Sequence, residues 1–173
     1  MDALQTLSNY KNVSNIPHIL FGTLVVDIIA ILLAKNTSLL GRVLKRWYDQ
    51  FNLSAVIADV LVIVLGILIA QYIYTEFFKS YGPLAFLVII VLVQIIHDIL
   101  FYVGVIQTVP FRQNKVMDIF SDYAKEAGAR IIAGDAVLML ASVTVAAASL
   151  HLSTPLFAFL GILAVYVVPY AIY

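Results

Sequence analysis

The chain has 173 residues, of which 63% are hydrophobic and only 12% are charged, and its mean hydropathy is +1.02. A soluble domain carries roughly 25% charged residues, so this composition indicates an integral membrane protein. The ten basic and ten acidic side chains cancel and form no dense run, which excludes a nucleic-acid-binding surface, and the absence of cysteine excludes disulfides, thiolate metal sites and thiol nucleophiles.

The apolar segments follow a polar N-terminal stretch that lacks the basic and apolar regions of a cleavable signal peptide. A hydrocarbon core about 30 Å thick requires roughly 20 apolar residues per helix, and five segments approach or reach that length. We expect transmembrane helices at about residues 17–34, 54–74, 83–107, 130–152 and 155–173. The predicted fold class is therefore an all-α polytopic transmembrane helical bundle, with residues 1–173 forming a single transmembrane domain.

Two connecting segments, at about residues 39–51 and 115–127, repeat apolar residues at helical spacing and predict short amphipathic helices along the inner membrane interface. Such a helix either hides its apolar face against the bundle, which is the simpler interpretation, or binds the membrane surface or a partner. The aromatic residues of these helices are interpreted as interfacial anchors, because tryptophan and tyrosine favour the headgroup region: Trp47, Tyr48, Phe51 and Tyr123.

The basic residues of the connecting segments predict the orientation of the chain. Eight of the ten lie in the loops after the first and third spans, and only Lys11 and Lys79 lie on the opposite side. Short loops rich in Lys and Arg stay cytoplasmic. We therefore expect an exoplasmic N-terminus and, with five spans, a cytoplasmic C-terminus.

A faint internal repeat relates the first two spans to the third and fourth. The stretch that starts at Trp47 resembles the stretch that starts at Asp122, and VVDIIAILL at Val25 resembles IHDILFYVG at Ile96. This pattern is typical of a parallel repeat of two helical hairpins, with the fifth span added at the C-terminus. Chance similarity between apolar segments is the alternative.

The repeat aligns four aspartates that lie inside four successive spans: Asp27, Asp59, Asp98 and Asp135. Gln94 lies one helical turn before Asp98, and together with His97 it gives the third span a polar strip. His97 and Asp98 are about 100° apart on the helix, so we expect their partners to come from other helices. Because an acid facing lipid costs about 2.5–3.5 kcal/mol, Asp98 and at least two of the other acids are predicted to share one polar interior with Gln94 and His97.

Three functions are compatible with these acids. Protonated or hydrogen-bonded carboxylates join helices in a structural or interaction protein, which is the first interpretation. The same acids bind a cation or relay protons in a channel or transporter, with His97 titrating near neutral pH, which is the alternative. An enzyme is not expected, because the chain has no HExxH or other compact ligand pair, and we predict neither a metal nor a cofactor.

The stretches LSAVIADVLVIVLG, VQIIHDILFY, YAKEAG and AGDAVLML resemble uncharacterised multi-span membrane proteins of large DNA viruses of algae and protists. The resemblance covers about the second to fourth spans and implies a location in a virion inner membrane or a host endomembrane. Expected partners are the lipid bilayer, further copies of the chain, and other membrane or capsid proteins. The resemblance implies no activity.

Overall fold

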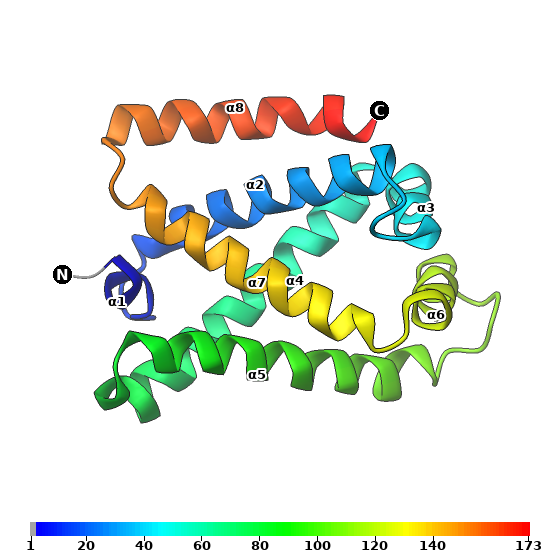
Figure 1. Cartoon of the computed structure of the whole chain (residues 1–173), viewed down its shortest axis with the longest axis horizontal. Coiled ribbons are helices and arrows are strands. Elements are labelled where there is room, and N and C mark those ends of the chain that lie inside the picture. Colours follow the sequence, from blue (N-terminus) through cyan, green and yellow to red (C-terminus); the bar gives the residue numbers. More distant parts are fainter. Residues whose placement is uncertain (1–2) are drawn as a thin grey trace.

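The chain folds into a helical bundle, described here by a computed structural model over residues 3–173 (Figure 1). Within those residues every regular element is a helix, which confirms the predicted all-α class. Five helices are long and apolar enough to cross a membrane. They are α2 (Asn15–Asn36), α4 (Leu53–Ile73), α5 (Pro83–Phe101), α7 (Arg130–Ser149) and α8 (Thr154–Ile172).

Two of the long helices continue beyond their α-helical part in turns of different pitch. After α4 the chain forms a π-helical turn, η1 (Tyr74–Phe78), and a 3-10 turn, η2 (Lys79–Tyr81). After α5 it forms a second π-helical turn, η3 (Tyr102–Ile106). Gly82, at φ +80°, then lets the chain reverse between η2 and Pro83 at the start of α5.

Three short helices lie at the two ends of the bundle. At one end is α1 (Ala3–Leu7), and at the other are α3 (Arg42–Phe51) and α6 (Lys115–Ala127) (Figure 1). The predicted amphipathic segment 39–51 begins as a helix only at Arg42, because residues 38–41 form a turn that Gly41 closes at φ +86°. The segment 115–127 is helical over its predicted length, and the Asn114 side chain accepts from the backbone N–H groups of Val116 and Met117.

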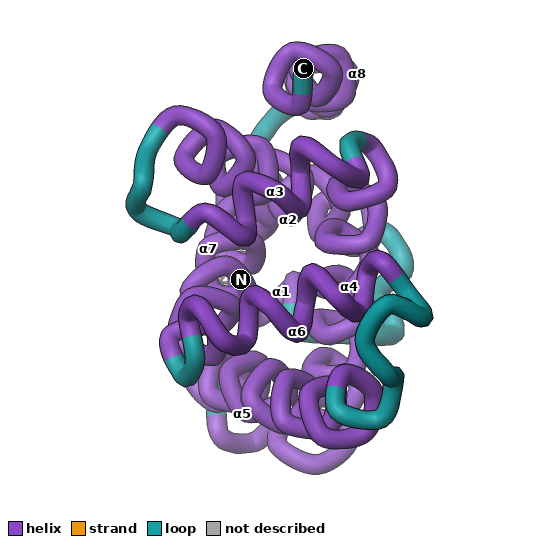
Figure 2. The backbone as a smooth tube through the Cα atoms, turned by 90° about the vertical axis from the view of Figure 1, so that its right-hand side faces the viewer, coloured by secondary structure: helices purple, strands orange, loops and turns teal. Residues whose placement is uncertain are grey.

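The most extensive contact in the bundle is between α2 and α7, which lie close together near the α1 end and diverge towards α3 and α6 (Figure 1). Helix α5 packs on α4 and α7, and α4 also packs on α2. Helix α8 packs chiefly on α2 and lies at the edge of the bundle (Figures 1 and 2). Many large apolar side chains on the outer faces are exposed, as expected of a surface in contact with lipid acyl chains.

The contacts are those expected of two related halves, α2–α3–α4 and α5–α6–α7. If the two halves correspond, α2 matches α5, α3 matches α6 and α4 matches α7. The α2–α7 contact then matches the α5–α4 contact, and the α2–α4 contact matches the α5–α7 contact. All four contacts are present, as is the α3–α6 contact. Both surface helices also end at a residue with positive φ, Asn52 at 49° and Gly128 at 54°, which leads directly into the following span. This arrangement is compatible with the internal repeat, which stays a prediction from the sequence.

The orientation in the membrane can be tested by labelling single cysteines with a membrane-impermeant maleimide. Ser14 and Ser80 are exposed at the α1 end, and Ser38 and Asn114 are exposed at the end formed by α3 and α6. Because the basic loops lie at the latter end, cysteines at 14 and 80 should react from the exoplasmic side, whereas those at 38 and 114 should react only after permeabilisation. The reverse pattern would invert the orientation.

Candidate functional site

Two of the intramembrane acids lie directly beneath α3. Tyr48 donates its hydroxyl to Asp27 Oδ1 at 3.1 Å, and the indole N–H of Trp47 donates to Asp59 Oδ2 at 2.9 Å. Trp47 and Tyr48 are only 3% and 2% exposed. Consecutive residues of the surface helix therefore fasten it to α2 and α4 through carboxylates.

This arrangement corrects the interpretation of Trp47 and Tyr48 as interfacial anchors, because both side chains face the bundle rather than the lipid headgroups. Phe51 is half-buried and packs on the Trp47 ring at 4.9 Å, and Tyr123 is also half-buried. The physical reason is that buried carboxylates need donors, and the indole N–H and phenol O–H supply them. Periodicity identified the apolar face of the helix correctly, but it could not reveal what that face covers.

The polar side chains of α5, Gln94, His97 and Asp98, contact one another. Gln94 Nε2 donates to Asp98 Oδ1 at 2.7 Å, and His97 Nδ1 lies 3.2 Å from the same oxygen. The expectation that partners of His97 and Asp98 come from other helices is therefore wrong for these contacts. Adjacent side chains can lean together despite a 100° separation of their Cβ directions, and the His97 ring is held in place by stacking on Phe101, one turn further on.

Asp135 differs from the other acids in making no hydrogen bond or ion pair with any residue between 3 and 173. Its neighbour on α6 is Tyr123, whose pKa is raised to about 12 by burial and by the negative charges of Asp135 and Asp59, with smaller contributions from Glu126 and Asp98. Burial and the charges of Asp59 and Asp27 likewise raise the pKa of Tyr48 well above its usual range. Each surface helix thus places one tyrosine near the acids, Tyr48 near Asp27 and Asp59, and Tyr123 near acids of both halves.

The four aspartates form what we call the acid cluster: Asp27, Asp59, Asp98 and Asp135. Their charges interact pairwise, Asp27 with Asp59, Asp59 with Asp135, and Asp135 with Asp98. In the part of the chain that the structure describes, no lysine or arginine forms an ion pair with any of them, and His97 is the one titratable cation in contact. Within the same residues, no three acidic or histidine side chains converge closely enough to hold a metal ion.

Two carboxylate oxygens of the acid cluster are buried without a hydrogen-bond partner, Oδ2 of Asp27 and Oδ2 of Asp98. An ionised carboxylate left in this state loses solvation that nothing replaces. Protonation removes the charge and turns one oxygen into a donor. The geometry therefore leaves one oxygen of each of these two carboxyl groups without a donor among the residues that the structure describes.

The surface helices α3 and α6 together cover the acid cluster and are joined to each other. The Glu126 carboxylate accepts from the backbone N–H groups of Arg42 and Val43, at 3.1 and 2.8 Å, and so caps the N-terminus of α3. Arg46 pairs with Asp122 at 2.5 Å and holds the pKa of that carboxyl below its usual range. The surface helices α3 and α6 of the two halves are thus held in place by contacts with each other.

A second set of polar side chains lies on α2 and α7, from the acid cluster towards the α1 end. We call it the polar stripe: His18, Thr23 and Asp27 on α2, and Asp135, Ser142 and Ser149 on α7. The last three are seven residues apart and share one face, which spans about 21 Å at 1.5 Å per residue. Near the α1 end, His18 Nδ1 lies 2.7 Å from Ser149 Oγ.

The middle of the polar stripe is closely packed and lacks internal hydrogen bonds. The hydroxyls of Thr23 and Ser142 are fully buried, and neither has a hydrogen-bond partner. Gly22 allows α2 to approach so closely that a Cβ there would lie 2.7 Å from the backbone nitrogen of Ala146 and closer still to the Ser142 carbonyl. Buried serine and threonine hydroxyls usually bond to the carbonyl one turn earlier, as Thr144 does on the outer face of α7.

The structure thus brings the predicted site residues to the covered end of the bundle, Asp27 and Asp59 under α3 and Asp98 and Asp135 near α6. The sequence interpretation missed Trp47 and Tyr48 as donors to these acids, and the only available signal was the internal repeat that aligns Tyr48 with Tyr123. Comparison of the chain with protein-family models, with curated proteins and with solved structures finds no match.

Proposed function

We propose that this integral membrane protein moves protons across the bilayer, with the acid cluster as the site that takes them up and releases them. The observation that carries the proposal is the charge balance of that cluster, in which four intramembrane carboxylates interact and none is paired with lysine or arginine. Acids fixed by permanent cations would be structural ion pairs. Acids without such partners bind and lose protons as the local pH changes.

The polar stripe marks the path that we infer for the protons. Hydroxyl groups can both donate and accept, and the unpartnered hydroxyls of Thr23 and Ser142 lie between the acid cluster and the His18–Ser149 pair. A proton route through them requires water to enter this closely packed contact and bridge the hydroxyls. His97 is the titratable cation in contact with the cluster, and its side chain on α5 is 42% exposed. We infer a route from the α1 end through the polar stripe to the acid cluster and His97.

A second candidate is a structural or interaction protein of the membrane. The bonds from Tyr48 to Asp27 and from Trp47 to Asp59 favour it, because they fasten a surface helix to two spans as interhelical bonds do in a purely architectural bundle. In this role the acids are protonated or hydrogen-bonded and join neighbouring helices. The exposed aromatic face of α8, which includes Phe159, Tyr166 and Tyr170, would then meet lipid, a second copy of the chain or another membrane protein.

Proton movement can be measured in reconstituted vesicles with a trapped pH-sensitive dye and an imposed potassium diffusion potential. We expect the wild type to acidify or alkalinise the lumen according to the sign of the potential. Asp135→Asn should reduce this flux to the level of protein-free vesicles, because it removes a titratable group while keeping the side-chain volume. His97→Ala should leave flux but alter its pH dependence.

The matched control for these variants is Asp49→Asn, which removes a carboxylate that is 46% exposed and paired with Lys35 outside the acid cluster. Its flux should equal that of the wild type. If the wild type moves no protons between about pH 5 and pH 8, the structural candidate replaces the transport proposal. Equal flux from Asp135→Asn and the wild type would remove the acid cluster from the route.

A further inference from the structure

The end of the bundle opposite α3 and α6 carries the short segment of residues 3–11, which we call the α1 segment (Figure 1). It consists of α1 and the turns that follow it, and α1 packs on α7. Leu7 is fully buried in the hydrophobic core and Ser8 is 1% exposed, whereas the other residues of the segment are half-buried or exposed. The segment therefore covers this end of the bundle with Leu7 inserted into it.

The backbone of the α1 segment is fastened to two spans by buried amide side chains. Asn15, at the start of α2, donates at 2.9–3.3 Å to three carbonyls of the segment, those of Thr6, Leu7 and Asn9. Gln71, near the end of α4, donates to the same Leu7 carbonyl. Both amides are 1% exposed, so they lose their partners and must find water if the segment moves away.

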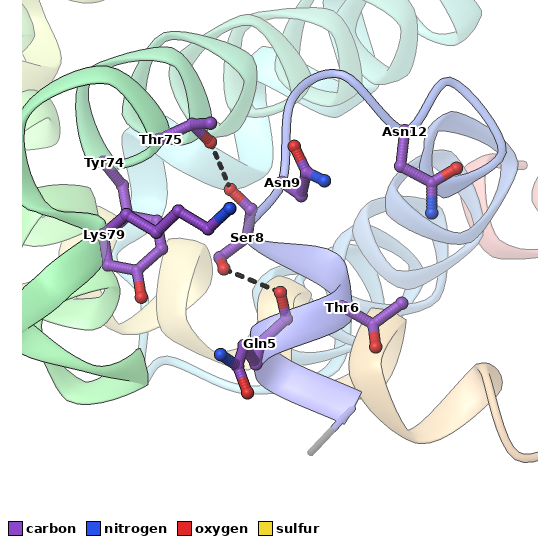
Figure 3. A pocket seen from close by; sticks show the side chains of 8 residues that line it. All are labelled: Gln5, Thr6, Ser8, Asn9, Asn12, Tyr74, Thr75 and Lys79. Carbon is purple, nitrogen blue, oxygen red and sulfur yellow. Dashed lines mark hydrogen bonds between the residues drawn. The ribbon is translucent and has the colours of Figure 1, made fainter. Parts of the chain in front are cut away.

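The π-helical turn η1 supplies further contacts to the α1 segment. The Thr75 hydroxyl donates to the Ser8 carbonyl at 3.1 Å and accepts from the backbone N–H of Tyr10 at 3.3 Å (Figure 3). The Glu76 carboxylate pairs with Lys11 at 3.1 Å. The segment is thus held largely by single polar side chains, which is typical of a unit that opens locally while the rest of the protein stays folded.

A cavity of about 460 Å³ lies beneath α1, between the α1 segment and the turns η1 and η2. Gln5 and Asn9 are among the residues that line it from the segment, and Thr75 and Lys79 line it from the turns (Figure 3). The segment therefore has space on one side into which it can move without displacing a transmembrane helix.

The polar stripe ends at the same end of the bundle, in the pair formed by His18 of α2 and Ser149 of α7. Ser149 is 2% exposed, and its helix is the one on which α1 packs. Water that enters the α2–α7 contact from this end has to pass this pair. Because the hydrogen bonds that hold the α1 segment can be exchanged for bonds to water, opening this end costs little more than the burial of Leu7.

We propose that the α1 segment is a gate. While it is fastened to α2, α4 and η1 it keeps water out of the polar stripe, and when it moves towards the cavity it admits water to the His18–Ser149 pair. The inference rests on the proposed function, because it gives the same proton route a means of control. Its first test, however, measures the entry of a reagent and needs no proton flux.

The first test follows labelling by a small water-soluble methanethiosulfonate in nanodiscs that contain the full chain. The sequence has no cysteine, so Ser149→Cys places a single thiol at a buried position of the polar stripe. Adding Gln71→Leu keeps a side chain of similar size and removes the donor to Leu7, and Thr75→Val does the same for Ser8. Each should raise the labelling rate at position 149 by about tenfold, as a lost hydrogen bond increases the open population.

Two controls accompany the labelling. Ser153→Cys, at an exposed position of the same end, should react rapidly and equally with and without Gln71→Leu. Gln113→Leu, at an exposed glutamine of the opposite end, should leave the labelling rate at position 149 unchanged. Equal rates at position 149 in the presence and absence of both Gln71→Leu and Thr75→Val overturn the gate.

The second test locks the α1 segment without changing a buried residue. Lys11→Cys together with Glu76→Cys replaces an ion pair whose side chains are 64% and 34% exposed, and a short bis-methanethiosulfonate joins the two thiols. The joined protein should lose proton flux in vesicles, and a reductant that cleaves the link should restore it. The matched control joins Tyr166→Cys to Tyr170→Cys, one turn apart on the exposed face of α8, and should keep its flux.

The two tests separate failure of the gate from failure of the proposed function. Equal flux before and after the link between positions 11 and 76 is cleaved overturns the gate and leaves proton transport intact. A wild type without flux overturns proton transport, and the labelling rate at position 149 then decides on the gate alone.

Discussion

Gly22→Ala is expected to destabilise the bundle by about 1–3 kcal/mol or more, the cost of adding a methyl group to a closely packed core. The new Cβ would meet the Ser142 carbonyl and the Ala146 nitrogen, both backbone atoms of α7 that cannot rotate away. The helices must separate, and the α2–α7 contact is the most extensive in the bundle. Unfolding by titration of a denaturing detergent into mild micelles, followed by circular dichroism, measures the change.

Gly161→Ala is the control for this substitution. Gly161 lies inside α8, and a Cβ there would have no heavy atom within 4 Å. Alanine in an open helical position gains about 0.5–1 kcal/mol over glycine, so this variant should be as stable as the wild type or more stable. Equal stability of Gly22→Ala and Gly161→Ala would show that α2 and α7 are not in close contact in the membrane.

Trp47→Ala is expected to have the largest effect of any change in the surface helices, a loss of about 3–5 kcal/mol of unfolding free energy. The ring is 3% exposed and packs on Phe51 and Phe120 at centroid distances of 4.9 and 5.0 Å. Its removal also takes the donor from Asp59. Detergent-induced unfolding gives the total loss, and limited proteolysis near residues 37–41 reports the release of α3.

The intermediate variant Trp47→Phe separates the two contributions, because it retains much of the ring and removes the N–H. It should cost about 1–3 kcal/mol, the range for a buried acceptor left unsatisfied. Phe111→Ala, at a loop position where the ring is 61% exposed, should change neither stability nor proteolysis. A Trp47→Ala protein as resistant to protease as the Phe111→Ala protein would mean that α3 is held by contacts other than Trp47.

The long elements follow from hydropathy and periodicity because each depends on a local property of the chain. A run of about 20 apolar residues crosses the hydrocarbon core whatever its neighbours are, and α2, α5 and α7 begin within a few residues of their predicted starts. The C-terminal ends of the spans are predicted less accurately from the sequence. The second span continues through η1 and η2 to Tyr81, because the apolar pattern carries no signal for a change of helical pitch.

The contacts of the site depend on packing between helices, which a local pattern does not encode. The positions of the aspartates indicated a polar interior, but the donors to Asp27 and Asp59 come from α3, where an aromatic pair equally suits a headgroup interface. His97 and Asp98 meet through their rotamers, which Cβ directions do not determine. The cavity beneath α1 depends on Asn15 and Gln71 reaching backbone carbonyls of a segment with no apolar signal.

The hydrogen bonds to the aspartates have a consequence for synthesis on the ribosome. Helix α2 ends at Asn36, whereas its main neighbour α7 begins only at Arg130, so α2 enters the bilayer long before that neighbour exists. Its carboxylate is nevertheless covered early, because Tyr48 leaves the ribosome soon after Asp27, and Asp98 is covered by Gln94 and His97 of its own helix. Each hydrogen-bonded acid thus receives its donor from a nearby stretch of chain. The insertion machinery can therefore release successive spans into the bilayer without exposing these acids to lipid unpaired.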